Sequence, residues 1–136
     1  MKKIFLISCV SKKLDCPAKA RDLYISPLFK FNLQFAKKSK ADKIFILSAK
    51  HGLISLEKTI EPYNLTLNNM KDFEIREWAK IVLVKLTKYA DLENDEFTFL
   101  VGIKYRKYLV PHFLHYKVPM QGLGIGKQLK YLKDHL

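Results

Sequence analysis

Three short apolar runs stand out along the chain, and each is bounded by polar or charged residues. They cover residues 3–8, 43–48 and 97–101, a length that is too short for a helix and typical of strands buried on both faces. A weaker run at residues 115–118 predicts a fourth strand at an edge of the sheet. The stretches at residues 12–25 and after Leu53 show no periodic apolar pattern, and we expect them to be irregular.

Apolar residues recur at helical spacing between these runs. Ser26 followed by Pro27 predicts a helix start, with serine as the N-cap and proline at the first helical position. Three more helices are expected, at residues 71–89 with Asn68 or Asn69 as the cap, from Gly102 to an interruption at Pro111, and after Gly126. Buried faces are expected on three of these helices. Their residues are Leu28, Phe31, Leu33, Phe35 and Ala36 in the first helix; Ile75, Trp78, Ala79, Val82, Leu86 and Tyr89 in the helix at residues 71–89; and Ile125, Leu129, Leu132 and Leu136 in the last helix.

Strands that alternate with helices predict a single three-layer α/β domain over residues 1–136. We expect a mostly parallel four-stranded sheet with helices on both faces and right-handed crossovers. Numbered along the chain, the strands are expected in the order 2-1-3-4. The chain then reverses direction between the first and third strands, so the segments at residues 8–13 and 102–106 would flank the crevice where ligands bind in such sheets.

Positive charge dominates the composition. The 136 residues include 25 Lys and Arg against 13 Asp and Glu, a formal net charge of +12. Such a surface attracts polyanions, so we expect a nucleic acid, with DNA favoured over RNA, or a nucleotide as partner. The alternative is that the lysines only keep the surface solvated.

Other functional classes have less support in the sequence. No apolar run approaches the roughly 20 residues that span a bilayer, and no secretory signal is apparent, so we expect a cytoplasmic protein without membrane contact. The two cysteines, Cys9 and Cys16, are expected to be reduced. The four histidines and two cysteines lie in different segments without zinc-like spacing, so neither a metal nor another cofactor is expected.

The polar residues that follow the strands are the candidates for substrate binding, because parallel strands place their carboxyl ends at one edge of the sheet. Hydroxyls and cations would hold phosphate, the tyrosines would stack a base, and the glycine turn would present backbone N–H groups. The set comprises Ser8, Ser11, Lys12, Lys13, Tyr24, Ser26, Lys50, Tyr63, Tyr105, Arg106, Gly122 and Gly124. In the alternative reading, the tyrosines tie down loops and the glycines only allow a tight turn.

Three residues are candidates for catalysis. His51 follows the second strand and would act as general acid or base, unless it only fixes its loop. Glu61 precedes Pro62 in a loop and is the best carboxylate general base, ahead of Asp22, although it could simply pair with a lysine. Cys9 lies near Lys12 and Lys13, whose charge would favour the thiolate, but a small inert thiol beneath a turn is the reading we favour.

Six motifs occur in order: S-C-x-S-K-K from Ser8, D-L-Y-x-S-P-L-F from Asp22, S-A-K-H-G-L from Ser48, E-P-Y-x-x-T-L from Glu61, G-x-x-Y-R from Gly102 and G-L-G-I-G-x-Q-L from Gly122. Together they resemble a family of small uncharacterised bacterial, archaeal and phage proteins over nearly the whole chain. Residues 8–15 and Pro62–Tyr63 are also distantly similar to the YaaA peroxide-stress family. Cys9 and Lys13 keep the C-x-x-x-K spacing of a motif in archaeosine synthase.

These resemblances imply an α/β domain like that of uracil-DNA glycosylases, working on or near nucleic-acid bases. The leading hypothesis is a glycosylase-like or base-modifying enzyme that binds phosphate through a basic pocket at the carboxyl ends of the strands. The second is a non-catalytic DNA-binding stress protein of the YaaA type. A third is a transferase or hydrolase that depends on Cys9 and acts on a small phosphorylated substrate.

Overall fold

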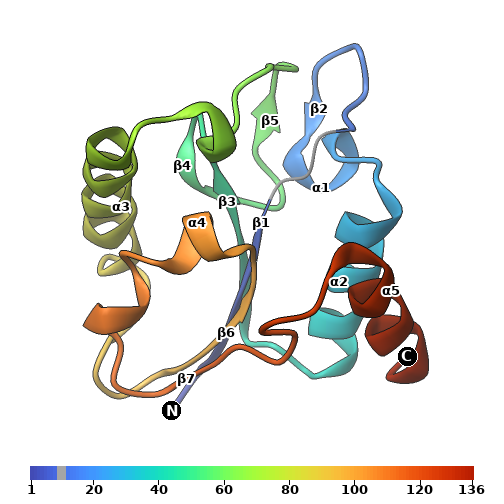
Figure 1. Ribbon diagram of the computed structural model, residues 1–136. Coiled ribbons are helices and arrows are strands. Elements are labelled where there is room, and N and C mark those ends of the chain that lie inside the picture. Colours follow the sequence, from blue (N-terminus) through green and yellow to red (C-terminus); the bar gives the residue numbers. More distant parts are fainter. Residues whose placement is uncertain (9–11) are drawn as a thin grey trace.

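A five-stranded sheet forms the centre of the computed structural model, which describes residues 1–8 and 12–136 (Figure 1). Its strands are β1 (Lys3–Ser8), β3 (Lys43–Ser48), β4 (Gly52–Ser55), β6 (Glu96–Leu100) and β7 (Tyr116–Lys117). They lie in the order β4-β3-β1-β6-β7, and all neighbours are parallel except β4, which runs antiparallel to β3. The predicted order is thus confirmed for the four parallel strands, whereas the predicted count of four is wrong because a hairpin adds β4.

The hairpin closes through residues 49–51, and Ser48 pairs with Gly52 across it. Gly52 has a φ of +72°, in the left-handed region that glycine enters without a steric penalty. This residue therefore lets the chain reverse directly after β3. The expectation of an irregular segment after Leu53 is wrong at this point, because β4 has only four residues and too little alternation to stand out in the sequence.

The two stretches expected to be irregular pair with each other. β2 (Ala18–Lys19) and β5 (Thr59–Ile60) form a two-stranded antiparallel sheet, and the short helix α1 (Ala20–Leu23) follows β2. Backbone N–H groups of Ala20 and Arg21 donate to the carbonyls of Lys58 and Leu56. Pairing between segments about 40 residues apart leaves no local periodicity, which is why the pattern of the sequence did not predict it.

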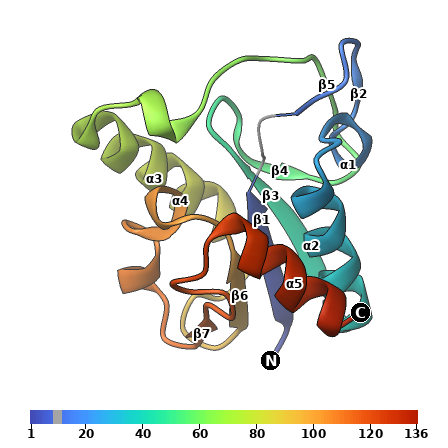
Figure 2. The ribbon, with the colours of Figure 1, turned by 45° about the vertical axis from the view of Figure 1, so that its right-hand side comes forward.

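Helices cover both faces of the main sheet, as predicted (Figure 2). α2 and α5 lie on one face, and α3 and α4 lie on the other (Figure 1). The helices span α2 (Pro27–Lys38), α3 (Asp72–Leu86), α4 (Ile103–Arg106) and α5 (Ile125–Asp134), with 3-10 turns η1 (Leu67–Asn69) and η2 (Val110–His112). Within the described ranges, no helix is both long and apolar enough to cross a membrane.

The helix boundaries confirm some predictions and correct others. Ser26 is the N-cap of α2, where its Oγ accepts a hydrogen bond of 3.2 Å from the Phe29 N–H. The predicted caps Asn68 and Asn69 lie instead in η1. α3 begins after Lys71, because the carboxylate of Glu74 accepts a hydrogen bond of 3.0 Å from the Lys71 N–H.

The buried faces of the helices are also partly different from the prediction. In α3 the five predicted residues from Ile75 to Leu86 are buried, but Tyr89 lies beyond the helix and is half exposed. In α5 only Leu132 is fully buried, and Ile125 is exposed. α2 contacts both β1 and α5, so its buried stripe is rotated toward Phe29, Asn32 and Ala36, and the predicted Leu28, Phe31, Leu33 and Phe35 are only half buried.

Candidate functional site

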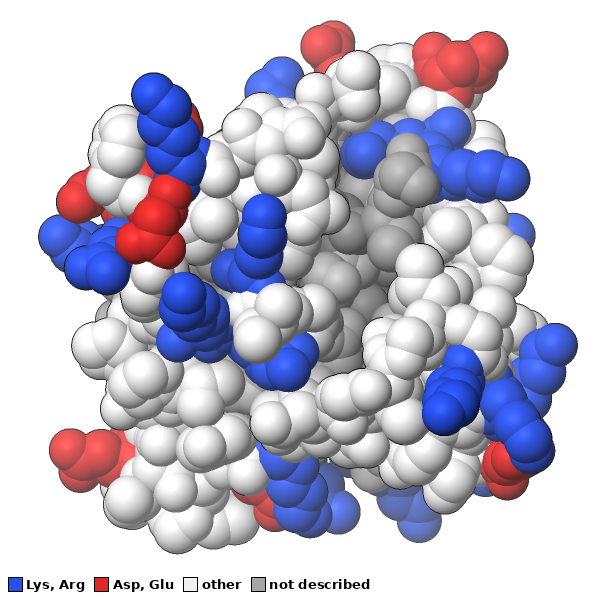
Figure 3. Space-filling view, in the orientation of Figure 1, with Lys and Arg blue, Asp and Glu red and all other residues white. Residues whose placement is uncertain are grey.

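β1 lies where the chain changes from one face of the sheet to the other. α2 connects β1 to β3 on one face, and α3 leads from β4 to β6 on the opposite face (Figure 2). Because these connections leave in opposite directions, a crevice opens beyond the carboxyl ends of β1 and β6. Figure 3 shows Lys and Arg side chains on both sides of the middle of this face. The crevice, with the cavities that open along it, is the candidate site.

Two tyrosines and a serine form a hydrogen-bonded group beside the crevice. The hydroxyl of Tyr63 lies 2.7 Å from that of Tyr24 and 2.7 Å from the Oγ of Ser48. Ser48 ends β3 and is fully buried, and its carbonyl accepts a hydrogen bond of 2.8 Å from the indole N–H of Trp78. The group therefore ties the loop around Tyr63 to the end of β3 and, through Trp78, to α3.

Lys13 places a cation against this group. Its Nζ lies 4.6 Å from the ring centroid of Tyr63 and 5.7 Å from that of Tyr24, both within range of a cation–π interaction. A bridge between Lys13 and Tyr24 holds the backbone, and flanking N–H groups of Leu14 and Ile25 donate to Leu23 and Lys12. The ammonium group of Lys13 is thus fixed at the crevice by both backbone and aromatic contacts.

His51 lies in the β3–β4 turn. Its N–H donates to the Oγ of Ser48 at 3.1 Å, its carbonyl accepts from Lys85 at 3.0 Å, and its ring meets that of Tyr63 edge-on with centroids 5.4 Å apart. Burial, followed by the charges of nearby lysines, lowers the pKa of His51 below 6.5. Its Nε2 is buried and finds no hydrogen-bond partner among the residues described. At neutral pH the ring is therefore uncharged.

A cavity of about 490 Å³ opens next to Lys13, which is the size of a small-ligand pocket. Its polar wall includes Ser8, Lys13, Asn32, Thr66, Tyr105 and Gln128. Its apolar wall includes Leu65, Ile103 and Ile125, which remain 38, 65 and 66% exposed. Exposed apolar side chains from the segment before η1, from α4 and from α5 thus border a cavity that also contains a cation.

A second cavity of about 400 Å³ shares the segment at residues 100–103 and Gln128 with the first. Arg106 lies in its wall, and its guanidinium donates a hydrogen bond of 2.8 Å to the carbonyl of Val101. Gly122 also contributes, with a φ of +82° that favours glycine. Among the described residues, neither cavity has an Asp or Glu in its wall, and no three His, Cys, Asp or Glu residues gather as a metal site.

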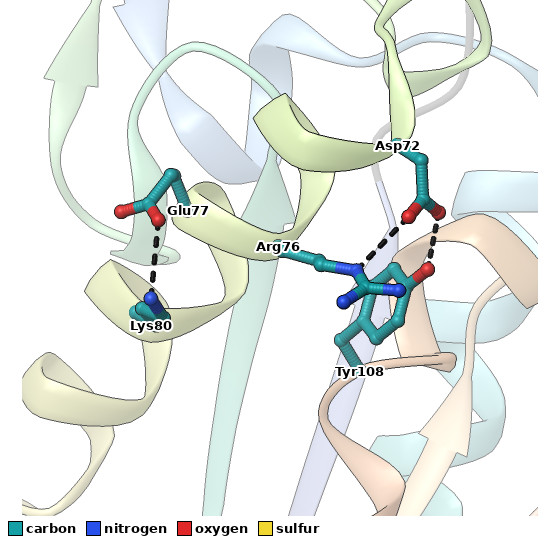
Figure 4. A network of polar contacts seen from close by, with 5 residues as sticks. All are labelled: Asp72, Arg76, Glu77, Lys80 and Tyr108. Carbon is teal, nitrogen blue, oxygen red and sulfur yellow. Dashed lines mark hydrogen bonds and ion pairs between the residues drawn. The ribbon is translucent and has the colours of Figure 1, made fainter.

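Polar contacts hold the segment after α4 against α3 (Figure 4). The Tyr108 hydroxyl donates to the carboxylate of Asp72, which also accepts a hydrogen bond of 2.9 Å from the Nε of Arg76. The bond from Tyr108, above all, lowers the pKa of Asp72. A separate pair, Glu77 and Lys80, stays within α3. The first network therefore helps to fix the position of α4, whose first turn borders both cavities.

The crevice gathers several of the predicted site residues. Ser8, Lys13 and Tyr105 border the first cavity, Arg106 and Gly122 border the second, and Tyr24, Tyr63 and His51 form the adjoining cluster with Ser48. Tyr24 and Tyr105 are almost fully buried, whereas Tyr63 is partly exposed.

Other predicted residues have different surroundings. Glu61 is exposed, and its carboxylate forms no ion pair or hydrogen bond within the described part of the chain. Lys12, Lys50 and Gly124 are exposed, and Ser26 is occupied as a helix cap. Cys9 and Ser11 lie outside the described residues.

Sequence reasoning did not single out Asn32, Thr66, Lys104 and Gln128 as site residues, although all four border the first cavity. Asn32 had a signal that could have found it. It is a polar residue three positions after Phe29 and four before Ala36, which places it on the apolar stripe of α2. The others lie on loops or exposed helix faces, where polar residues are usual.

The chain was also compared with known proteins. No curated protein and no solved structure matches it. A family model described as a family of unknown function, DUF6884, matches residues 4–134. This match covers nearly the whole chain, so the protein belongs to the family DUF6884.

Proposed function

We propose that the protein binds a nucleotide, free or within a nucleic acid, in the crevice and processes its base. The observation that carries this proposal is the first cavity, where the cation of Lys13 lies beside exposed apolar side chains. A nucleotide has two parts that complement these, an anionic phosphate and a base with flat apolar faces. The net charge of +12 supports a polyanionic partner.

The phosphate is assigned to the cationic side of the cavity. Lys13 is fixed there against Tyr63, and Lys104 reaches the same cavity from α4. Arg106 in the neighbouring cavity would hold a second phosphate, because a guanidinium matches phosphate oxygens with two parallel hydrogen bonds. The base is assigned to the part of the cavity bordered by Ile103 and Ile125. Both side chains are exposed in the free protein, and a bound base would remove their apolar surface from water.

His51 is the group that we assign to proton transfer. Its lowered pKa leaves the ring neutral at pH 7, which is the form that accepts a proton. Its Nε2 has no partner among the described residues and is the atom that would accept the proton, although His51 borders the Tyr63 cluster and neither cavity. Glu61 keeps the role of a charged group that could approach a bound nucleic acid from its exposed loop. Together these roles correspond to a glycosylase-like or base-modifying reaction.

A second candidate function is binding without turnover, as in a DNA-binding stress protein. It is favoured by one observation, that no carboxylate lines either cavity among the described residues. Cleavage of a glycosidic bond uses a carboxylate or histidine to activate water or to stabilise the developing positive charge. If His51 does not serve in that way, the same basic crevice would hold nucleic acid without changing it.

Binding is tested with a fluorescent single-stranded oligonucleotide over a series of salt concentrations. We expect affinity to fall as salt rises, and Lys13→Gln to reduce the slope by about 0.7, the value for one phosphate contact on a single strand. Lys88→Gln is the matched control, since Lys88 is exposed and lies outside both cavities. Equal slopes for Lys13→Gln and wild type would remove Lys13 from the phosphate site.

Turnover is tested with plain and modified-base DNA by measuring released base, abasic sites and changed nucleosides. An active protein should lose the activity on His51→Gln while its affinity changes by less than about threefold. Glu61→Gln, tested in parallel, measures whether the exposed carboxylate contributes. Tight, salt-sensitive binding without any product across the panel would leave the second candidate function as the answer.

A further inference from the structure

Asn32 is a buried amide on a helix face that is otherwise apolar. It lies in the middle of α2 and is only 3% exposed. Its Oδ1 is fully buried and has no hydrogen-bond partner in the described part of the chain. Its neighbours on the same stripe, Phe29 and Ala36, belong to the hydrophobic core.

This arrangement destabilises the protein. A buried polar atom without a partner loses its hydrogen bond to water and gains nothing in return. Asparagine is also a weaker helix former than leucine in a helix interior. Leucine has the same branched arrangement of side-chain heavy atoms, with a larger volume, and would satisfy the apolar stripe. The presence of asparagine at this position therefore has no explanation in the stability of the free protein.

The surroundings of Asn32 supply a different explanation. Asn32 borders the first cavity together with Leu28, one turn earlier in α2, and Gln128 of α5. Lys13 and Ile125 border the same cavity. An amide that lacks a partner therefore lies at the wall of a space that also has a cation and an exposed apolar side chain.

We propose that Asn32 recognises the edge of a nucleobase in the first cavity. A carboxamide has a carbonyl oxygen and an N–H₂ group side by side, and nucleobases offer an N–H donor next to a ring nitrogen or a carbonyl oxygen. Two parallel hydrogen bonds satisfy both groups once a change of side-chain rotamer brings Oδ1, which is buried in the free protein, to the cavity. The ligand class is thereby a base-bearing nucleotide and not a sugar phosphate or polyphosphate. The inference rests on the proposed function and deepens it.

The first experiment measures the stability of the free protein. Asn32→Leu should raise Tm by about 2–5 °C, because it removes an unsatisfied buried amide and improves helix propensity. Gln34→Leu is the control, since Gln34 is exposed on the same helix and lies outside the cavity. A Tm of Asn32→Leu equal to or below that of wild type, or failure of this variant to fold, would show a structural role and overturn the inference.

The second experiment measures binding of AMP, CMP, GMP, UMP and ribose 5-phosphate by calorimetry. Wild type should bind at least one nucleoside monophosphate about tenfold or more tightly than ribose 5-phosphate. Asn32→Leu should reduce this ratio to below about threefold and leave the affinity for ribose 5-phosphate unchanged. Gln34→Leu should behave as wild type.

The possible outcomes separate the inference from the proposed function. If wild type binds a nucleotide and Asn32→Leu keeps the full preference for it, the inference is wrong and the proposed function stands. If wild type binds nucleotides and ribose 5-phosphate equally, a phosphate site remains and the reading of a base is overturned. If wild type binds none of the five compounds and no oligonucleotide, both proposals are wrong.

Discussion

Replacing Tyr63 with phenylalanine tests the hydrogen-bonded group beside the crevice. The change deletes one hydroxyl and keeps the ring that Lys13 and His51 contact. That hydroxyl lies 2.7 Å from the hydroxyls of Tyr24 and Ser48, which are 1 and 0% exposed. The loss of two hydrogen bonds between neutral groups, at about 1 kcal/mol each, should therefore lower the free energy of unfolding by about 2 kcal/mol.

Urea unfolding followed by fluorescence measures this loss. With a slope of about 2 kcal/mol per M, a loss of about 2 kcal/mol lowers the midpoint by about 1 M. Tyr89→Phe is the matched control, because Tyr89 is 50% exposed and its hydroxyl has no bond to other described residues. Its midpoint should equal that of wild type.

A double-mutant cycle with Ser48→Ala shows whether the loss comes from the proposed contact. If the two hydroxyls stabilise each other, the double variant should be more stable than the sum of the single losses predicts, by about 0.5–1.5 kcal/mol. An unchanged midpoint for Tyr63→Phe would refute the reasoning. Strict additivity with Ser48→Ala would show that the destabilisation does not pass through this hydrogen bond.

Three further predictions concern other parts of the fold. Burial and then the neighbouring lysines lower the pKa of His51, so the unfolded chain binds an additional proton as pH falls below about 6.5. The free energy of unfolding should therefore decrease on acidification, and less so in His51→Gln. Identical profiles of wild type and His51→Gln from pH 7.5 to 5 would contradict this. Asp72→Ala should lower Tm because Asp72 connects α3 to the segment after α4, whereas Glu77→Ala, whose ion pair stays within α3, should leave Tm unchanged; equal effects in thermal scans would mean that the connection contributes nothing. Gly52→Ala should destabilise the protein by about 1–2 kcal/mol because φ is +72°; the cost comes from the backbone alone, since the added Cβ meets only ordinary contacts. Gly126→Ala in α5 should instead stabilise the protein by up to about 1 kcal/mol. Chemical denaturation of both variants checks that the two effects have opposite signs.

Local patterns in the sequence were enough to predict the parallel part of the sheet and most of the helices. Continuous apolar runs such as residues 43–48 indicate strands buried on both faces. Ser26 followed by Pro27 marks the start of α2. The order of the parallel strands followed from the alternation of strands and helices, since short right-handed crossovers leave few arrangements. These features depend on residues close together in the chain.

The tertiary structure decided what depends on contacts between distant segments. β2 and β5 form only because residues about 40 positions apart meet. The buried stripe of α2 includes Asn32 because α2 packs against both β1 and α5. The sequence suggested that strand ends would carry the site, which stays a prediction; in the structure Lys13 and His51 each contact the ring of Tyr63. Which wall each residue occupies, and that Glu61 faces solvent, depends on where separate loops pack. A side chain's neighbours across the crevice are fixed by the summed packing of the whole core, which no local spacing encodes.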